Sequence, residues 1–93
     1  MFLKCHHGLM ANGFALRRSC PEHPPGVLFV LHDDDNDRLY LECDEVEHGY
    51  WDPALLNEIP FNPDVGIGQR RLATEADLVA AGWDVSMFEK RTA

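Results

Sequence analysis

The sequence predicts a small α+β domain that contains a β-hairpin, or a three-stranded antiparallel sheet, and two short helices. Two strand-like runs flank a polar turn, and capping residues mark helical segments later in the chain. A length of 93 residues is enough for one hydrophobic core and too short for two. We therefore expect a single domain over residues 1–93, divided into a hairpin region (20–51), a helical region (52–88) and a frayed tail (89–93).

The hairpin is predicted from two runs of strand length. Residues 27–32 form a continuous run of mainly β-branched, aromatic and other apolar residues, and residues 38–43 form a second run. The residues between them, 33–37, are polar and supply the turn. A second hairpin is expected near the start, because Asn12 and Gly13 lie between short apolar runs.

Capping residues predict where the two helices begin. Asp52 can accept hydrogen bonds from the first free amides of a helix over 53–59, in which a proline takes the first position. Thr74 does the same for a helix over 75–81, which has acidic residues in its first turn and a glycine after its end. Residues 61–71 contain one proline and two glycines and predict a surface connection.

Charge narrows the classes of partner. The formal net charge is -8, and residues 27–60 hold ten acidic residues against one arginine. Phosphate groups require a basic surface, so nucleic acid and anionic membranes are excluded as main ligands and a basic protein is the natural partner. The candidate contact residues are acidic or aromatic: Asp33, Asp34, Asp35, Asp37, Glu45, Glu47, Tyr50 and Trp51.

The pair Tyr50 and Trp51 allows two interpretations. Aromatic anchors surrounded by acidic residues are typical of binding hot spots. Alternatively, these rings seal the hairpin against the helix that follows.

The chain is expected to be cytoplasmic. Its longest apolar run, residues 27–31, is far below the roughly 20 residues that cross a bilayer, and its start lacks the apolar stretch of a secretory signal. Three cysteines, an odd number, favour reduced thiols or metal ligands over a disulfide framework.

Two Cys/His groups flank the hairpin. Cys20 and His23 precede it, and Cys43 and His48 follow it. Over residues 20–51 the chain resembles the zinc-ribbon family, in which two ligand pairs on turns beside a hairpin close a tetrahedral zinc site. The resemblance implies a zinc-ribbon-like core and a structural Zn²⁺ held by these four side chains.

The sequence also departs from the ribbon pattern. A ribbon would have cysteine where Val46 stands, so the fourth ligand must come from His48 or from Cys5, His6 and His7. Two interpretations remain open: the chain binds zinc, or the ancestral site is lost and an aromatic core holds the hairpin together.

Binding is a better expectation than catalysis. The sequence contains no serine elbow, phosphate-binding glycine loop or metalloprotease helix motif, so we expect no enzymatic activity. In size and charge the chain resembles small acidic bacterial immunity proteins, which neutralise a cognate toxin, and this implies a basic partner. The alternatives are a free-standing structural zinc-ribbon protein within a larger assembly and a minor metal-handling or enzymatic role of Cys5, His6 and His7.

Overall fold

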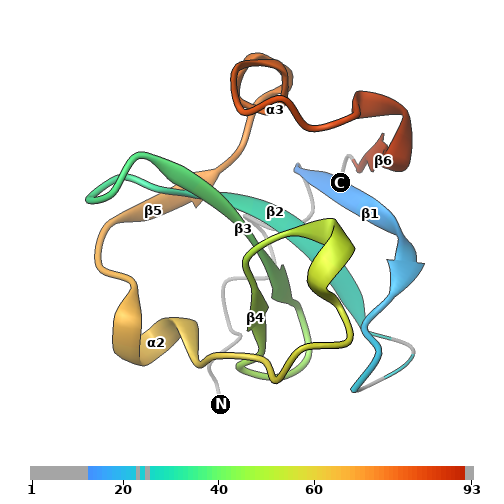
Figure 1. The fold of residues 1–93 in the computed structure, drawn as a ribbon, viewed down its shortest axis with the longest axis vertical. Coiled ribbons are helices and arrows are strands. Elements are labelled where there is room, and N and C mark those ends of the chain that lie inside the picture. Colours follow the sequence, from blue (N-terminus) through green and yellow to red (C-terminus); the bar gives the residue numbers. More distant parts are fainter. Residues whose placement is uncertain (1–12, 23, 25, 92–93) are drawn as a thin grey trace.

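The computed structural model describes residues 13–22, 24 and 26–91 and shows an α+β fold built on a six-stranded antiparallel sheet (Figure 1). The strands are β1 (Phe14–Ser19), β2 (Val27–Asp33), β3 (Arg38–Cys43), β4 (Gly49–Tyr50), β5 (Arg70–Leu72) and β6 (Phe88–Lys90). The helical segments are the 3-10 helices η1 (Pro53–Leu55) and η2 (Val85–Met87) and the α-helices α2 (Pro63–Gly66) and α3 (Glu75–Ala80). The predicted α+β class is confirmed, but the sheet is larger than expected and a ribbon-like core stays a prediction.

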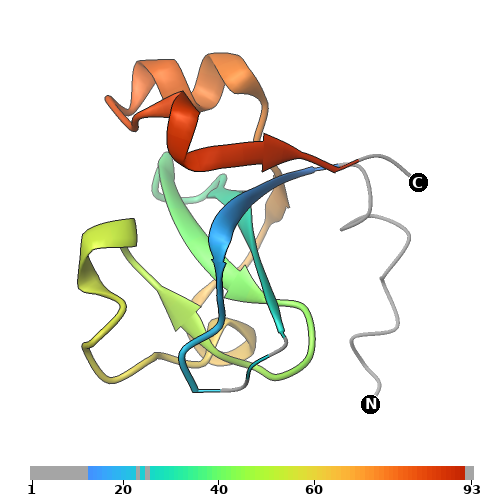
Figure 2. The ribbon, with the colours of Figure 1, turned by 90° about the vertical axis from the view of Figure 1, so that its right-hand side faces the viewer.

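Strand β2 organises the sheet. The main order is β4-β3-β2-β1-β6, and β5 also pairs with β2. Strand β3 occupies one edge of β2, while the other edge is shared by β1 and, toward the hairpin tip, by β5. Helix α3 lies at one end of the sheet and α2 at the opposite end (Figures 1 and 2).

The β2–β3 hairpin is buried on both faces. Successive side chains of a strand point to opposite faces, so Leu28 and Val30 join one apolar cluster while Phe29 and Leu31 join another. The first cluster also contains Leu78 of α3, and the second is covered by residues near α2 and β5. Burial on both sides explains why the run is continuously apolar and does not alternate with polar residues.

A polar network lies within the second face of the hairpin. Glu42 is fully buried and accepts a hydrogen bond of 2.9 Å from the hydroxyl of Tyr40, which is also fully buried. The Arg70 guanidinium on β5 lies 3.7 Å from the Glu42 carboxylate and 2.7 Å from that of Asp64. A buried carboxylate is tolerable only with polar or charged partners, and Arg70 on β5 is one of the groups that compensate the charge of Glu42.

The helix starts agree with their predicted caps, but the first helix is shorter than expected. Asp52 accepts from the Ala54 amide at 2.8 Å, yet only the 3-10 turn η1 follows, where a helix over 53–59 was predicted. Thr74 forms a reciprocal capping box with Asp77 at the start of α3. The predicted surface connection over 61–71 contains α2 and β5.

The C-terminal segment is also more ordered than the predicted frayed tail from Glu89. Strand β6 pairs with β1 through Phe14↔Lys90, Ala15↔Glu89 and Leu16↔Phe88. The Arg91 amide then donates to the Gly13 carbonyl at 2.8 Å. Strand β1 therefore pairs with β2 and β6, while Asn12 of the expected early hairpin lies outside the described residues.

Candidate binding surface

Asp33, at the end of β2, is enclosed within the fold. Its carboxylate is fully buried and accepts hydrogen bonds from Arg38 Nε at 3.1 Å and Asn36 Nδ2 at 3.0 Å. Burial by itself raises the pKa of Asp33, but these hydrogen bonds outweigh it, so the net pKa is lowered. Asp33 therefore fixes the turn and cannot face a partner in the folded chain.

The other acidic residues of the turn are engaged by neighbouring groups. The His32 ring lies between two carboxylates, with Nδ1 at Asp34 and Nε2 2.9 Å from Asp37. Arg71 lies 3.5 Å from Asp34, and Asp35 accepts from the Gln69 amide at 3.3 Å. The predicted acidic contact segment is thus partly neutralised at this end.

We expect the stability of the hairpin tip to decrease as pH rises past the pKa of His32. Burial lowers this pKa, but the hydrogen bonds to Asp34 and Asp37 raise it more, so it lies above 6.5. A raised pKa means that the protonated ring stabilises the folded state fully below pH 6.5, and this contribution is lost as pH rises through the folded-state pKa. Urea unfolding between pH 5.5 and 8.5 measures the effect, and the His32→Gln variant should show a flatter profile. An unchanged profile would contradict this assignment.

A second group of acidic residues has no such compensation. Glu45 and Glu47 lie in the turn after β3, Asp52 caps η1, and Glu58 follows η1. Within the described part of the chain, none of these four forms an ion pair with a cationic side chain. The unbalanced negative charge of the central segment is therefore associated with β4 and η1.

An apolar hollow lies beside edge strand β4, and one of these acidic residues, Glu58, is part of its lining. It has a volume of about 170 Å³, and its lining includes Trp51, Leu55, Ile59, Phe61 and the acidic Glu58. The exposed fractions are 38% for Trp51, 43% for Leu55 and 94% for Ile59. Large apolar side chains gathered at one hollow, with an acidic residue in its lining, have the composition of a protein-binding hot spot.

Trp51 is held in place by groups stacked on its ring. Phe61 is stacked on it with ring centroids 4.1 Å apart and an interplanar angle of 13°. The Arg38 guanidinium carbon lies 3.8 Å from the centroid of the Trp51 ring. One face cannot hold both groups, so the indole is sandwiched and little side-chain entropy remains to be lost on binding.

Trp51 also lines a second hollow, of about 400 Å³, toward α3. Arg38, Leu39 and Trp83 line the same space. Trp51 therefore separates two neighbouring hollows, a form that suits a partner with more than one anchoring side chain.

Tyr50 also lines the hollow beside β4, but it is only 2% exposed and offers a partner almost no accessible surface. Its hydroxyl faces the Cys20 thiol, and no described residue offers it a hydrogen bond of good geometry. Burial, followed by the proximity of Cys20, raises the pKa of Tyr50 above its usual range. Tyr50 therefore fits the interpretation in which the aromatic pair seals the hairpin. Trp51 fits the interpretation in which it is accessible to a partner.

Cys20 and Cys43 come together at the end of the hairpin. Both are fully buried free thiols, and they lie side by side. The Glu45 amide donates to Cys43 Sγ at 3.4 Å, and Val46, which stands where a ribbon has cysteine, packs against the same cluster. Burial raises the pKa of Cys43 to about 11, so its thiol is protonated at neutral pH unless a metal displaces the proton.

The remaining predicted metal ligands do not complete this pair in the described structure. His48 has a buried Nδ1 without a hydrogen-bond partner, but no three His, Cys, Asp or Glu side chains among the described residues are grouped to hold a metal ion. His23, and the Cys5, His6 and His7 cluster, lie outside the described residues.

The comparisons with known proteins assign no family. The chain matches no protein-family model, and neither the curated proteins nor the solved structures provide a match. None of the described helices is long and apolar enough to cross a bilayer.

Sequence reasoning missed most of the hollow. Leu55 and Ile59 were assigned to a helix over 53–59, where spacing of four residues would place both on one face. The helix ends at Leu55, and beyond it the Ile59 side chain is exposed to solvent while Leu56 is buried. Pro60 agrees with a helix end at Ile59, but nothing in the sequence marks the earlier end at Leu55 or shows which apolar side chains remain exposed.

Proposed function

We propose that this protein is a binding module for a basic protein, which docks on the hollow beside β4. The observation that carries the proposal is the gathering of Trp51, Leu55 and Ile59 at one hollow. Its lining includes Glu58, and Asp52 adjoins Trp51 in sequence; neither carboxylate forms an ion pair among the described residues. The apolar side chains would supply affinity, and the acidic side chains would steer a cationic partner and select against anionic ones. An inhibitor or immunity protein that neutralises a basic toxin is a biological role that this surface fits.

The proposal is tested by photo-crosslinking in cells that make the protein. A photoreactive residue at position 59 is compared with one at position 65, because Val65 is a similarly exposed apolar residue (84%) away from the hollow. We expect a basic partner to crosslink at position 59 and not at position 65. Equal crosslinking at both positions, or an acidic partner, would contradict the proposal.

Once the partner is identified, Ile59→Asp should weaken its binding about tenfold or more, because the substitution places a charge in the apolar contact. The control variant Val65→Asp should leave the affinity within about twofold. Surface plasmon resonance at several salt concentrations measures both variants. The association rate of the unchanged protein should fall as salt rises, since steering by exposed charges is screened. Binding that does not depend on salt would argue against a role of the acidic side chains.

A structural zinc site is the second candidate function, favoured by the adjacent Cys20 and Cys43 thiols and the amide-to-sulfur hydrogen bond at Cys43. His23 follows Cys20 closely in sequence and is the next predicted ligand. Elemental analysis should find one zinc per chain, and a chelator should lower the melting temperature strongly, because metal binding contributes directly to folding. Metal-free protein whose melting is unchanged by chelator would indicate that the two thiols serve only in packing.

A further inference from the structure

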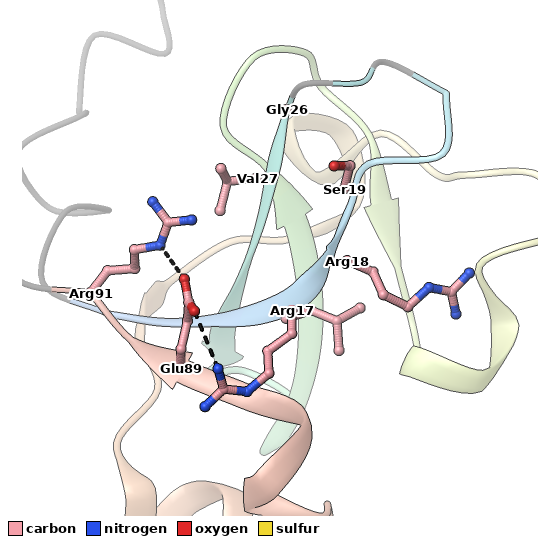
Figure 3. A pocket seen from close by; sticks show the side chains of 8 residues that line it. Arg17, Arg18, Ser19, Gly26, Val27, Glu89 and Arg91 are labelled. Atoms are coloured by element: carbon pink, nitrogen blue, oxygen red, sulfur yellow. Dashed lines mark hydrogen bonds and ion pairs between the residues drawn. The ribbon is translucent and has the colours of Figure 1, made fainter.

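The far side of the sheet from β4 contains a different kind of hollow. It has a volume of about 260 Å³ and lies at strands β1, β2 and β6 (Figure 3). Arg17, Arg18 and Arg91 line it together with a single acidic residue, Glu89. In a chain with a net charge of -8, this local excess of positive charge is the opposite of what the composition predicts.

The β1–β2 pairing is irregular at this hollow. Ala15 pairs with Phe29 and Ser19 pairs with Val27, so four residue steps on β1 match only two on β2. The surplus residues cannot follow the regular ladder, and the register shifts between the two pairs. Residues 16–19 of β1 and Val27 of β2 line the hollow, so it lies at this irregular stretch of the pairing.

Glu89 holds two arginines beside each other. Its carboxylate accepts from Arg17 Nη1 at 3.4 Å and from Arg91 Nε at 2.9 Å, as Figure 3 shows. Arg17 also donates through Nε to the Ser86 carbonyl at 3.2 Å. A guanidinium has five N–H donors, so these bonds leave donors available on both side chains. The Arg18 side chain extends away from Glu89 and contributes mainly charge.

We propose that this hollow is a binding site for the oxyanion of a small molecule, either a phosphate or a carboxylate group. Two oriented guanidinium groups match the geometry of both anions, and the volume exceeds that of the anion, leaving room for an attached group. The site lies on the opposite edge of the sheet from the β4 hollow, so it is independent of the proposed protein partner.

The experiment is an NMR titration of the full chain with sodium phosphate, in which the arginine Nε–H and backbone resonances are followed. Sodium acetate is titrated as the second anion, and sodium chloride serves as the reference. The ionic strength is kept constant, because salt screens the repulsion between anions and the negatively charged protein. We expect saturable shifts of the Arg17 and Arg91 resonances. Saturation with phosphate alone identifies a phosphate site, and saturation with both anions identifies a general oxyanion site.

A matched pair of variants gives the decisive comparison. Arg17→Gln should weaken anion binding about tenfold, because it removes one charged donor. Lys90→Gln removes the same charge from β6, but Lys90 projects over the Phe14 ring on the other face, so binding should stay within about twofold. Arg17 is 58% exposed, so its replacement should not prevent folding. Shifts that match those with chloride, or equal losses in the two variants, would overturn the proposal.

Discussion

Replacing Arg70 by methionine is expected to lower the free energy of unfolding by about 3 kcal/mol, among the largest effects of any single substitution in this protein. The Glu42 carboxylate is fully buried, and the Arg70 guanidinium, 3.7 Å away, compensates its charge. Methionine fills a similar space but removes this charge and the ion pair with Asp64. Urea unfolding at pH 7 measures the loss.

Two comparisons test whether the loss arises from the buried carboxylate. Asp64→Asn removes only the exposed partner of Arg70, and it should cost well under 1 kcal/mol. In a Glu42→Gln background the buried charge is absent, so Arg70→Met should cost clearly less there than in the unchanged protein. A loss that is equal in the two backgrounds would show that side-chain packing, not charge, causes the effect.

Gly49→Ala is expected to lower the free energy of unfolding by about 2 kcal/mol and to disturb the hollow beside β4. A Cβ atom at this position would lie 2.6 Å from the nearest atom of the Phe61 ring. Phe61 exchanges two backbone hydrogen bonds with Gly49, of 2.8 and 3.0 Å, which hold its main chain in place, so its ring can give way only by leaving its stack on Trp51. Trp51, which is stacked on Phe61, should become more exposed and its fluorescence should shift to the red.

The control for this substitution is Gly66→Ala at the end of α2. A Cβ atom there would meet nothing within 4 Å, so stability should remain within about 0.5 kcal/mol or increase slightly. Fluorescence is best compared in a Trp83→Phe background, so that Trp51 is the only source of indole emission. If Gly49→Ala is as harmless as Gly66→Ala, the close approach of Phe61 does not constrain this edge.

The hairpin could be predicted almost to the residue, because its signal is local. Strands were expected over 27–32 and 38–43, and they are observed as Val27–Asp33 and Arg38–Cys43. Strands β5 and β6 could not be found in this way, since each has three residues and two of them are charged. They exist because β2 and β1 offer unpaired edges, and that is a property of the assembled sheet.

The candidate surface shows the same division between local and tertiary information. The sequence indicated the acidic segment and Trp51 as candidates. It also predicted that the acidic turn at the hairpin tip is available to a partner. His32, Arg38 and Arg71 engage that turn, and Arg71 approaches it from β5. Glu45, Glu47, Asp52 and Glu58, near β4 and η1, have no ion pair among the described residues, and only the positions of the arginines in the fold reveal this difference.

Burial on both faces of the β2–β3 hairpin has a consequence for strand alignment. In a sheet with one wet face, a slip of one residue exposes apolar side chains and is opposed by water. Here both faces are apolar, so burial of apolar side chains differs little between the observed pairing and a pairing shifted by one residue. A slip would instead carry Glu42 to the opposite face, among Leu28 and Val30 and away from Arg70. The buried carboxylate therefore acts as an alignment marker, and the unique pairing of the central strands depends on a polar residue in an otherwise apolar core.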